Sequence, residues 1–203
     1  MRVKLAYAMG GLAMNLSNLV ISQWVFKRYV PSPEAALVPV GLFSAIFLLG
    51  RITDGVTDPL VSYWSDRLRS PRGRRLPFPR YGLLPFVGVF FLLWLPPVDG
   101  RSAWNIVWVC VGLQAYFVLY TVVVTPYLAL LPELTGDLDE RVNVTTWQAV
   151  FVMMGTVVFA LVPLVIQAGG WVVLAGLVAG LTLLSFGPTL LYVREAPRRE
   201  DPA

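Results

Sequence analysis

The residues best suited to chemistry lie in the stretch GRITDGVTDP, residues 50–59, where charged side chains interrupt an apolar run. Residues three or four apart share a helix face, so Asp54 and Asp58 point the same way, with Arg51 one turn earlier and Thr57 beside them. One guanidinium does not neutralise two carboxylates, so the remaining charge calls for a cation or a proton. Oxygen ligands suit Na⁺, whereas two close carboxylates favour a proton. Both ions stay open, and an internal salt bridge or helix-capping carboxylates would give the same pattern.

The composition predicts a membrane protein. Of the 203 residues, 57% are hydrophobic and 14% are charged, and the mean hydropathy is +0.68. Cys110 is the single cysteine and there is no histidine, which excludes disulfide frameworks, the usual zinc clusters and histidine proton relays. We expect no cofactor beyond a coupling ion, and we interpret the net charge of +4 as a signal of membrane topology rather than of nucleic-acid binding.

Six apolar segments are each long enough to cross a bilayer as a helix, which takes about 20 residues. The short alternating segments of a membrane β-barrel are missing. The sequence therefore predicts an all-α, polytopic protein with a polar tail at 194–203. The expected spans are 5–26, 36–64, 81–98, 103–131, 145–167 and 171–193.

Arginines predict the orientation of the spans. The connection SDRLRSPRGRRLPFPR and the tail VREAPRRE are basic, whereas PVDGRSA and QAGG carry almost no positive charge. Because basic connections stay in the cytoplasm, both termini are expected to be cytoplasmic, in a multi-pass protein of the bacterial inner membrane.

Two longer stretches carry a family resemblance. GRITDGVTDPLVSYWSDRLRSPRGRRLPF at 50–78 and TPYLALLPELTGDLDERVNVTTW at 125–147 resemble the glycoside-pentoside-hexuronide:cation symporters, the melibiose-permease-like branch of the major facilitator superfamily. The motifs follow the order of that family's N-terminal six-helix half. The resemblance implies a half bundle of the major-facilitator type. It also implies a coupling-cation site made by Asp54, Asp58, Thr57 and Thr121, with Thr57 in place of the asparagine found in Na⁺-using members.

The residues that hold sugars in those relatives are replaced. Asn15 stands where they have an aspartate on the first helix, Val124 where they have one on the fourth, and Gln148 near the position of an arginine. Melibiose-like transport is therefore not expected. Other polar residues of the spans are candidates for a solute cavity, although each could equally form an interhelical hydrogen bond. They are Asn15, Asn18, Gln23, Gln114, Tyr116 and Tyr120.

Charged residues between the spans resemble the superfamily loop that clasps neighbouring helices when the cytoplasmic side is closed. Binding of anionic lipid head groups is a compatible second reading of the basic loop. The expected gate residues are Asp66, Arg67, Arg74, Arg75, Glu140 and Arg141, with Gly73, Asp137 and Asp139 beside them.

Together these patterns predict a half-size secondary transporter in the lipid bilayer. It would pair with a second six-helix half, either a separately encoded chain or a second copy, because transporters of this type bind solute between two halves. The expected activity is Na⁺- or H⁺-coupled symport of a small organic solute by alternating access. A non-transporting membrane module that regulates or assembles a partner is the alternative. An enzyme is not expected, because the sequence has no nucleophile and base at a spacing that would bring them together for catalysis.

Overall fold

The computed structural model describes residues 2–68, 70, 73–193 and 195, and every regular element in them is a helix, which confirms the all-α prediction. The expected tail lies outside the described residues except for Glu195. The helices are α1 (Arg2–Tyr29), α2 (Val40–Arg67), α3 (Pro77–Leu92), α4 (Ala103–Ala129), α5 (Leu131–Leu134), α6 (Leu138–Ala160) and α7 (Val162–Tyr192).

Five of the described helices are long and apolar enough to cross a membrane. The third expected span is different, because α3 has 16 residues and is about 24 Å long, which is less than the hydrocarbon core of about 30 Å. It begins at Pro77, a residue whose fixed φ suits a first helical turn. It ends before Pro96 and Pro97, which cannot continue a helix. The helix therefore begins and ends earlier in the sequence than the expected span 81–98.

The boundary between the last two spans also lies elsewhere than expected. α6 ends at Ala160 and α7 starts at Val162, so the expected connection at 168–170 falls inside α7. Gly170 nevertheless has φ 73° and ψ −170°, values that no helical residue has, and it divides α7 into two helical segments. A residue without Cβ adopts this conformation easily. The break predicted from QAGG therefore exists, as a kink rather than as a loop.

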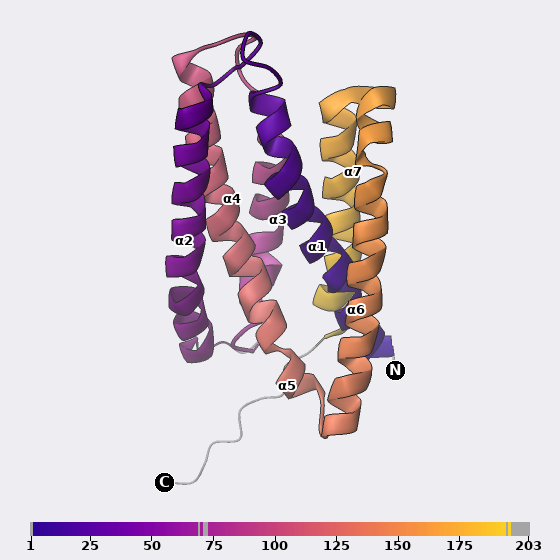
Figure 1. Cartoon of the computed structure of the whole chain (residues 1–203). Coiled ribbons are helices and arrows are strands. Elements are labelled where there is room, and N and C mark those ends of the chain that lie inside the picture. Colours follow the sequence, from indigo (N-terminus) through magenta and orange to yellow (C-terminus); the bar gives the residue numbers. More distant parts are fainter. Residues whose placement is uncertain (1, 69, 71–72, 194, 196–203) are drawn as a thin grey trace.

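The helices form one bundle in which α2, α4, α1 and the α6 and α7 pair lie side by side, with α3 behind (Figure 1). α1 packs against α6 and α7, α2 packs against α4, and α3 packs against α4 and α7. The first turns of α1 contact the last turns of α7, where Thr189 donates to the Ala6 carbonyl at 2.8 Å. The cytoplasmic location of this end stays a prediction.

A glycine brings α2 close to α4. Gly50 faces the ring of Phe117, and a Cβ added at Gly50 would lie 2.5 Å from the Cδ2 atom of that ring. The ring is held in place, since it is buried and packs edge-on against Phe47 and Tyr116. The close approach positions the polar residues that follow Gly50 on α2 opposite the matching turns of α4.

Candidate functional site

The predicted cation-site residues meet between α2 and α4. Thr121 Oγ1 donates to Asp54 Oδ1 at 3.0 Å, and Thr57 Oγ1 lies 3.4 Å from Thr121 Oγ1. Thr57 also donates to the Asp54 carbonyl at 3.2 Å. Thr121 is 1% exposed, so its hydroxyl is fixed within the bundle and directed at the carboxylate.

Asp58 is held by a residue that the sequence analysis missed. Thr125 Oγ1 donates to Asp58 Oδ1 at 2.9 Å. Thr125 follows Thr121 by one turn of α4, as Asp58 follows Asp54 on α2. That shared spacing was the signal that could have identified Thr125.

Arg51 neutralises only part of the charge at this site. Its Nη1 atom is 3.8 Å from Asp54 Oδ2, a long ion pair, and its guanidinium lies over the rings of Phe47 and Phe117 at 5.7 and 5.4 Å. Among the described residues no ion pair reaches Asp58. One carboxylate therefore has a hydroxyl but no positive charge beside it.

The donor atoms at this site are oxygens from carboxylates and hydroxyls, the ligand type that hard cations prefer. In the described part of the chain no three His, Cys, Asp or Glu side chains gather in a metal-binding group. Pro59 has no N–H, so the helical hydrogen bond to the carbonyl of Gly55 four residues earlier is missing at this turn of α2. The set fits a monovalent cation such as Na⁺, and it also fits a proton.

Two of the predicted cavity residues bind other helices instead. Asn15 donates to the Val152 carbonyl and to Thr156 Oγ1, both at 2.8 Å, and so ties α1 to α6. Gln114 accepts from Thr53 at 2.7 Å and donates to the Ile46 carbonyl at 3.2 Å, and so ties α4 to α2.

The other cavity candidates have different surroundings. Asn18 donates to the Tyr120 hydroxyl at 3.3 Å, and both side chains are partly buried between α1 and α4. Tyr116 is 1% exposed and packs against Phe86, which places it in the core.

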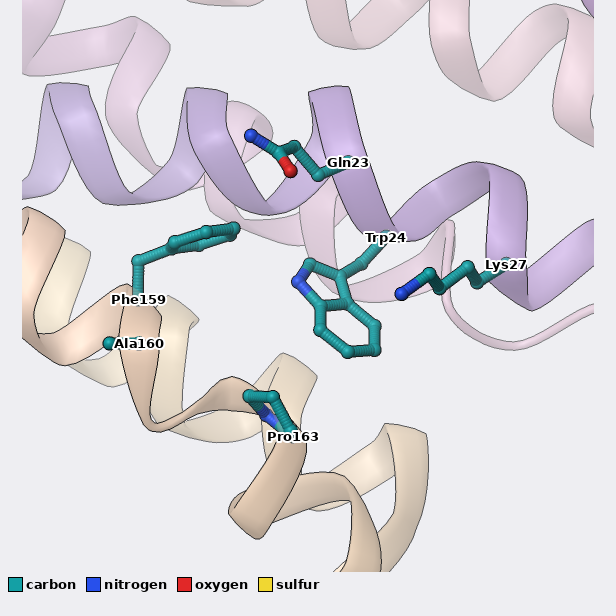
Figure 2. A pocket seen from close by; sticks show the side chains of 6 residues that line it. All are labelled: Gln23, Trp24, Lys27, Phe159, Ala160 and Pro163. Carbon is teal, nitrogen blue, oxygen red and sulfur yellow. The ribbon is translucent and has the colours of Figure 1, made fainter.

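Gln23 lines a cavity with a volume of about 160 Å³ (Figure 2). The cavity lies between α1, the end of α6 and the start of α7. The ammonium group of Lys27 lies in the wall of this cavity, and its Nζ atom is 4.2 Å from the centre of the Trp24 ring. The other lining residues are Phe159, Ala160 and Pro163.

Five charged residues gather where α2 ends. Arg75 pairs with Asp66 at 2.7 Å and with Glu133 of α5 at 3.2 Å, and it also donates to the Ala129 carbonyl. Arg74 pairs with Glu133 at 2.8 Å. We call Asp66, Arg74, Arg75, Glu133 and Glu195 the charge cluster; it joins α2, the connection to α3, α5 and the residue beyond α7.

Glu195 enters this cluster through the backbone. Its carboxylate accepts from the N–H of Arg75 at 2.9 Å and of Leu76 at 3.2 Å. Gly73 has φ 101°, and a Cβ there would lie 2.6 Å from Glu195 Cδ, so glycine is required on both counts. Burial raises the pKa of Glu195, the two N–H donors lower it, and the nearby Glu133 raises it further. The sequence analysis missed both acids, although each follows an apolar span and faces the basic connection.

The remaining expected gate residues lie outside the charge cluster. Glu140 pairs with Lys4 of α1 at 2.5 Å, and its backbone N–H bonds the carboxylate of Asp137, which caps α6. Arg67 lies over the Tyr63 ring at 4.0 Å. Arg141 forms no ion pair with any residue that the structure describes.

Comparison with known proteins gives a match over nearly the whole chain. The family model described as MFS/sugar transport protein matches residues 6–203. The putative glycoside/cation symporter YagG of Escherichia coli (strain K12) is 31% identical over 95% of the chain and 42% of its own length. The inner membrane symporter YicJ of the same organism is 29% identical over 90% of the chain and 39% of its own length. The sodium-dependent lysophosphatidylcholine symporter 1-A of Danio rerio is 29% identical over 76% of the chain and 28% of its own length.

The chain thus spans about two fifths or less of these relatives. All three are named as symporters. The family match and the two Escherichia coli relatives confirm the resemblance to the glycoside-pentoside-hexuronide:cation symporters.

Proposed function

Because the chain belongs to the MFS/sugar transport protein family, we propose that it forms one six-helix half of a symporter that couples Na⁺ or H⁺ to a small organic solute. The family is one of transporters, and the chain is a multi-pass plasma-membrane protein. The observation that carries the proposal is the convergence of two carboxylates and three hydroxyls between α2 and α4. Arg51, at 3.8 Å from Asp54, neutralises only part of the negative charge.

The coupling ion would bind at Asp54 and Asp58, with Thr57 and Thr121 supplying hydroxyl oxygens and Arg51 moderating the charge. Occupied by a cation, the site loses its excess negative charge, and the cost of holding carboxylates in a membrane falls. By linkage, if the cation raises solute affinity, the solute raises cation affinity by the same factor. This reciprocity is what coupled transport requires.

A second six-helix half would complete the site. Arg51 and Asp58 are exposed on the bundle, and exposed charged groups at membrane depth need a protein or water-filled neighbour. Alternating access then follows from one half rocking against the other around the ion and the solute. The partner could be a separate chain or a second copy of this one.

The chemistry of the solute differs from that of melibiose. Asn15 is engaged by α6, and Val124 offers no hydrogen bond, so the first and fourth helices provide no carboxylate for sugar hydroxyls. Gln23, Asn18 and Tyr120 remain as uncharged polar contacts for a solute.

The charge cluster would act as the cytoplasmic gate. It ties the ends of α2 and α4, the two helices that form the cation site, to the connection before α3. Movement of α2 during transport would break the Asp66 to Arg75 pair, and closure would restore it.

The test starts from native membranes expressing the full chain, with gentle extraction, measurement of native mass and identification of any second half. Vesicles containing that complex are then given a panel of labelled solutes that includes a glycoside and a lysophosphatidylcholine, the solutes in the names of two relatives, with and without an inward Na⁺ or proton gradient. We expect the gradient to accelerate uptake in the wild type and in Asp99→Asn, an exposed carboxylate in the connection before α4. Asp58→Asn should lose the acceleration. Gradient-driven uptake that persists in Asp58→Asn would contradict the proposed ion site.

A further inference from the structure

Thr125 pairs with Asp58 in the same way as Thr121 pairs with Asp54. The hydroxyl-to-carboxylate distances are 2.9 and 3.0 Å, and each pair is separated by 67 residues in the sequence. The equal separation arises because α2 and α4 run parallel and advance together by one turn (Figure 1). The two pairs are successive steps of one ladder between the helices.

The hydroxyl of Thr125 is directed away from its own helix. Threonine inside a helix commonly donates to the carbonyl four residues earlier, as Thr146 does to Val142 at 2.8 Å. Thr125 donates across to α2 instead. Pro126 follows it directly, so the backbone hydrogen bonding of α4 is already interrupted at this turn.

Asp58 needs a further partner. Arg51 approaches Asp54 and not Asp58 in the described structure, so the charge of Asp58 is met only by the Thr125 hydroxyl. A hydroxyl that donates its proton to a carboxylate still has lone pairs free to accept or to coordinate. Asp58 and Thr125 together therefore present adjacent oxygens to an incoming ion.

We propose that Thr125 is part of the coupling-cation site, where it fixes the Asp58 carboxylate and supplies a ligand oxygen to the ion. The inference rests on the proposed function and adds a residue that the family resemblance does not assign. The ligand set then contains two carboxylates and the hydroxyls of Thr57, Thr121 and Thr125. This is the set of hard oxygen donors that Na⁺ or Li⁺ would take.

The test measures binding of ²²Na⁺ to the full chain, with any second half that copurifies, in lipid nanodiscs at constant ionic strength held with choline chloride. Thr125→Val keeps the side-chain shape but removes the hydroxyl, and Thr125→Ser keeps the hydroxyl. Thr146→Val is the matched control, because its hydroxyl bonds the Val142 carbonyl of its own helix, α6, and takes no part in the contact between α2 and α4. Competition by Li⁺ is measured for each variant.

We expect Thr125→Val to weaken Na⁺ binding roughly tenfold or more, as for loss of a hydrogen bond to a charged group. Thr125→Ser should stay within about threefold of the wild type, and Thr146→Val should bind normally. The Li⁺ to Na⁺ preference should change in Thr125→Val, because a lost ligand alters the fit of the ion. A merely structural role would weaken both ions equally and would overturn the inference.

Other outcomes also decide. Wild-type affinity in Thr125→Val, or equal losses of affinity in the valine and serine variants, would overturn the role of Thr125. Loss of Na⁺ binding in Asp58→Asn would in that case still support the proposed ion site. Absence of Na⁺ and Li⁺ binding in the wild type would overturn the role of Thr125 as a metal-ion ligand. Gradient-driven uptake then decides separately whether H⁺ coupling survives.

Discussion

Replacing Gly50 with alanine should separate α2 and α4, the two helices that hold the proposed cation site. The new Cβ would lie 2.5 Å from the Phe117 ring, whereas carbon atoms in contact sit about 3.5–4.0 Å apart. Either the helices move apart by about 1 Å or the ring is displaced from its packing with Phe47 and Tyr116. Overpacking of this kind costs about 1–3 kcal/mol of folding free energy.

The same displacement should weaken ion binding. A shift of about 1 Å would take the Asp54 to Thr121 distance from 3.0 Å to a value at which no hydrogen bond forms. The loss of a hydrogen bond to a carboxylate corresponds to about 1.5–3 kcal/mol, so Na⁺ affinity should fall at least roughly tenfold. The control is Gly55→Ala on the same helix, where a Cβ meets nothing within 4 Å. That variant should fold normally or gain up to about 1 kcal/mol from helix propensity.

Two measurements test this prediction. Thermal unfolding of each variant in mild detergent, followed by tryptophan fluorescence without Na⁺, reports the packing cost, and ²²Na⁺ binding in nanodiscs reports the site. Gly50→Ala should be impaired in both, and Gly55→Ala in neither. If the two variants behave alike, the close approach at Gly50 does not position the site and the reasoning fails.

Three further predictions follow from other contacts. Asn105→Ala should lower the unfolding free energy by about 2–4 kcal/mol in chemical denaturation, because buried Asn105 bonds the backbone of Val98 twice and of Gly100 once. Asn15→Ala should lower the unfolding temperature in detergent, since it removes two bonds to α6, whereas Asn15→Asp should lower it further by placing a carboxylate against the Val152 carbonyl. The raised pKa of Glu195 means that the folded chain binds this proton more tightly than the unfolded chain, so stability should fall as pH rises from the ordinary value of about 4.5 to the raised one. Glu195→Gln should flatten that part of the stability profile measured by thermal unfolding at stepped pH.

Much of this architecture is encoded locally and was therefore predictable. Run length and hydropathy identify most spans, because a helix in a membrane must satisfy its own backbone and expose apolar side chains. The four-residue spacing of Asp54 and Asp58 places them on one face whatever the rest of the fold does. The structure agrees with that placement, and it brings Thr57 and Thr121 to the same spot.

The residues that were missed depend on contacts between distant segments. Thr125 faces Asp58 only because α2 and α4 are parallel and in register, which a single sequence does not state. Glu195 lies 120 residues from the Arg75 backbone that it binds. Asn15 and Gln114 were expected as candidates for a solute cavity, and in the structure each bonds a neighbouring helix. Whether such a side chain faces a cavity or a neighbouring helix depends on rotation of the helix about its axis. Small differences in hydropathy do not fix that rotation.

The proposed cation site lies between α2 and α4, and the charge cluster contacts the ends of these two helices, which would give a physical route between ion binding and the proposed gate. α2 carries Asp54 and Asp58 and ends one residue after Asp66, while α4 carries Thr121 and Thr125 and leads into α5 with Glu133. Arg75 forms ion pairs with Asp66 at the end of α2 and with Glu133 of α5, so both pairs can form only when the ends of α2 and α4 lie close together. A cation that draws the carboxylates and hydroxyls together would hold α2 and α4 in register and favour these ion pairs. Without the ion, only the Thr121 and Thr125 hydroxyls join these carboxylates to α4, so less would hold the two helices together and Arg75 would be released more easily. Coupling between the proposed cation site and the charge cluster therefore needs only rigid helices and the contacts already present between α2, α4 and α5.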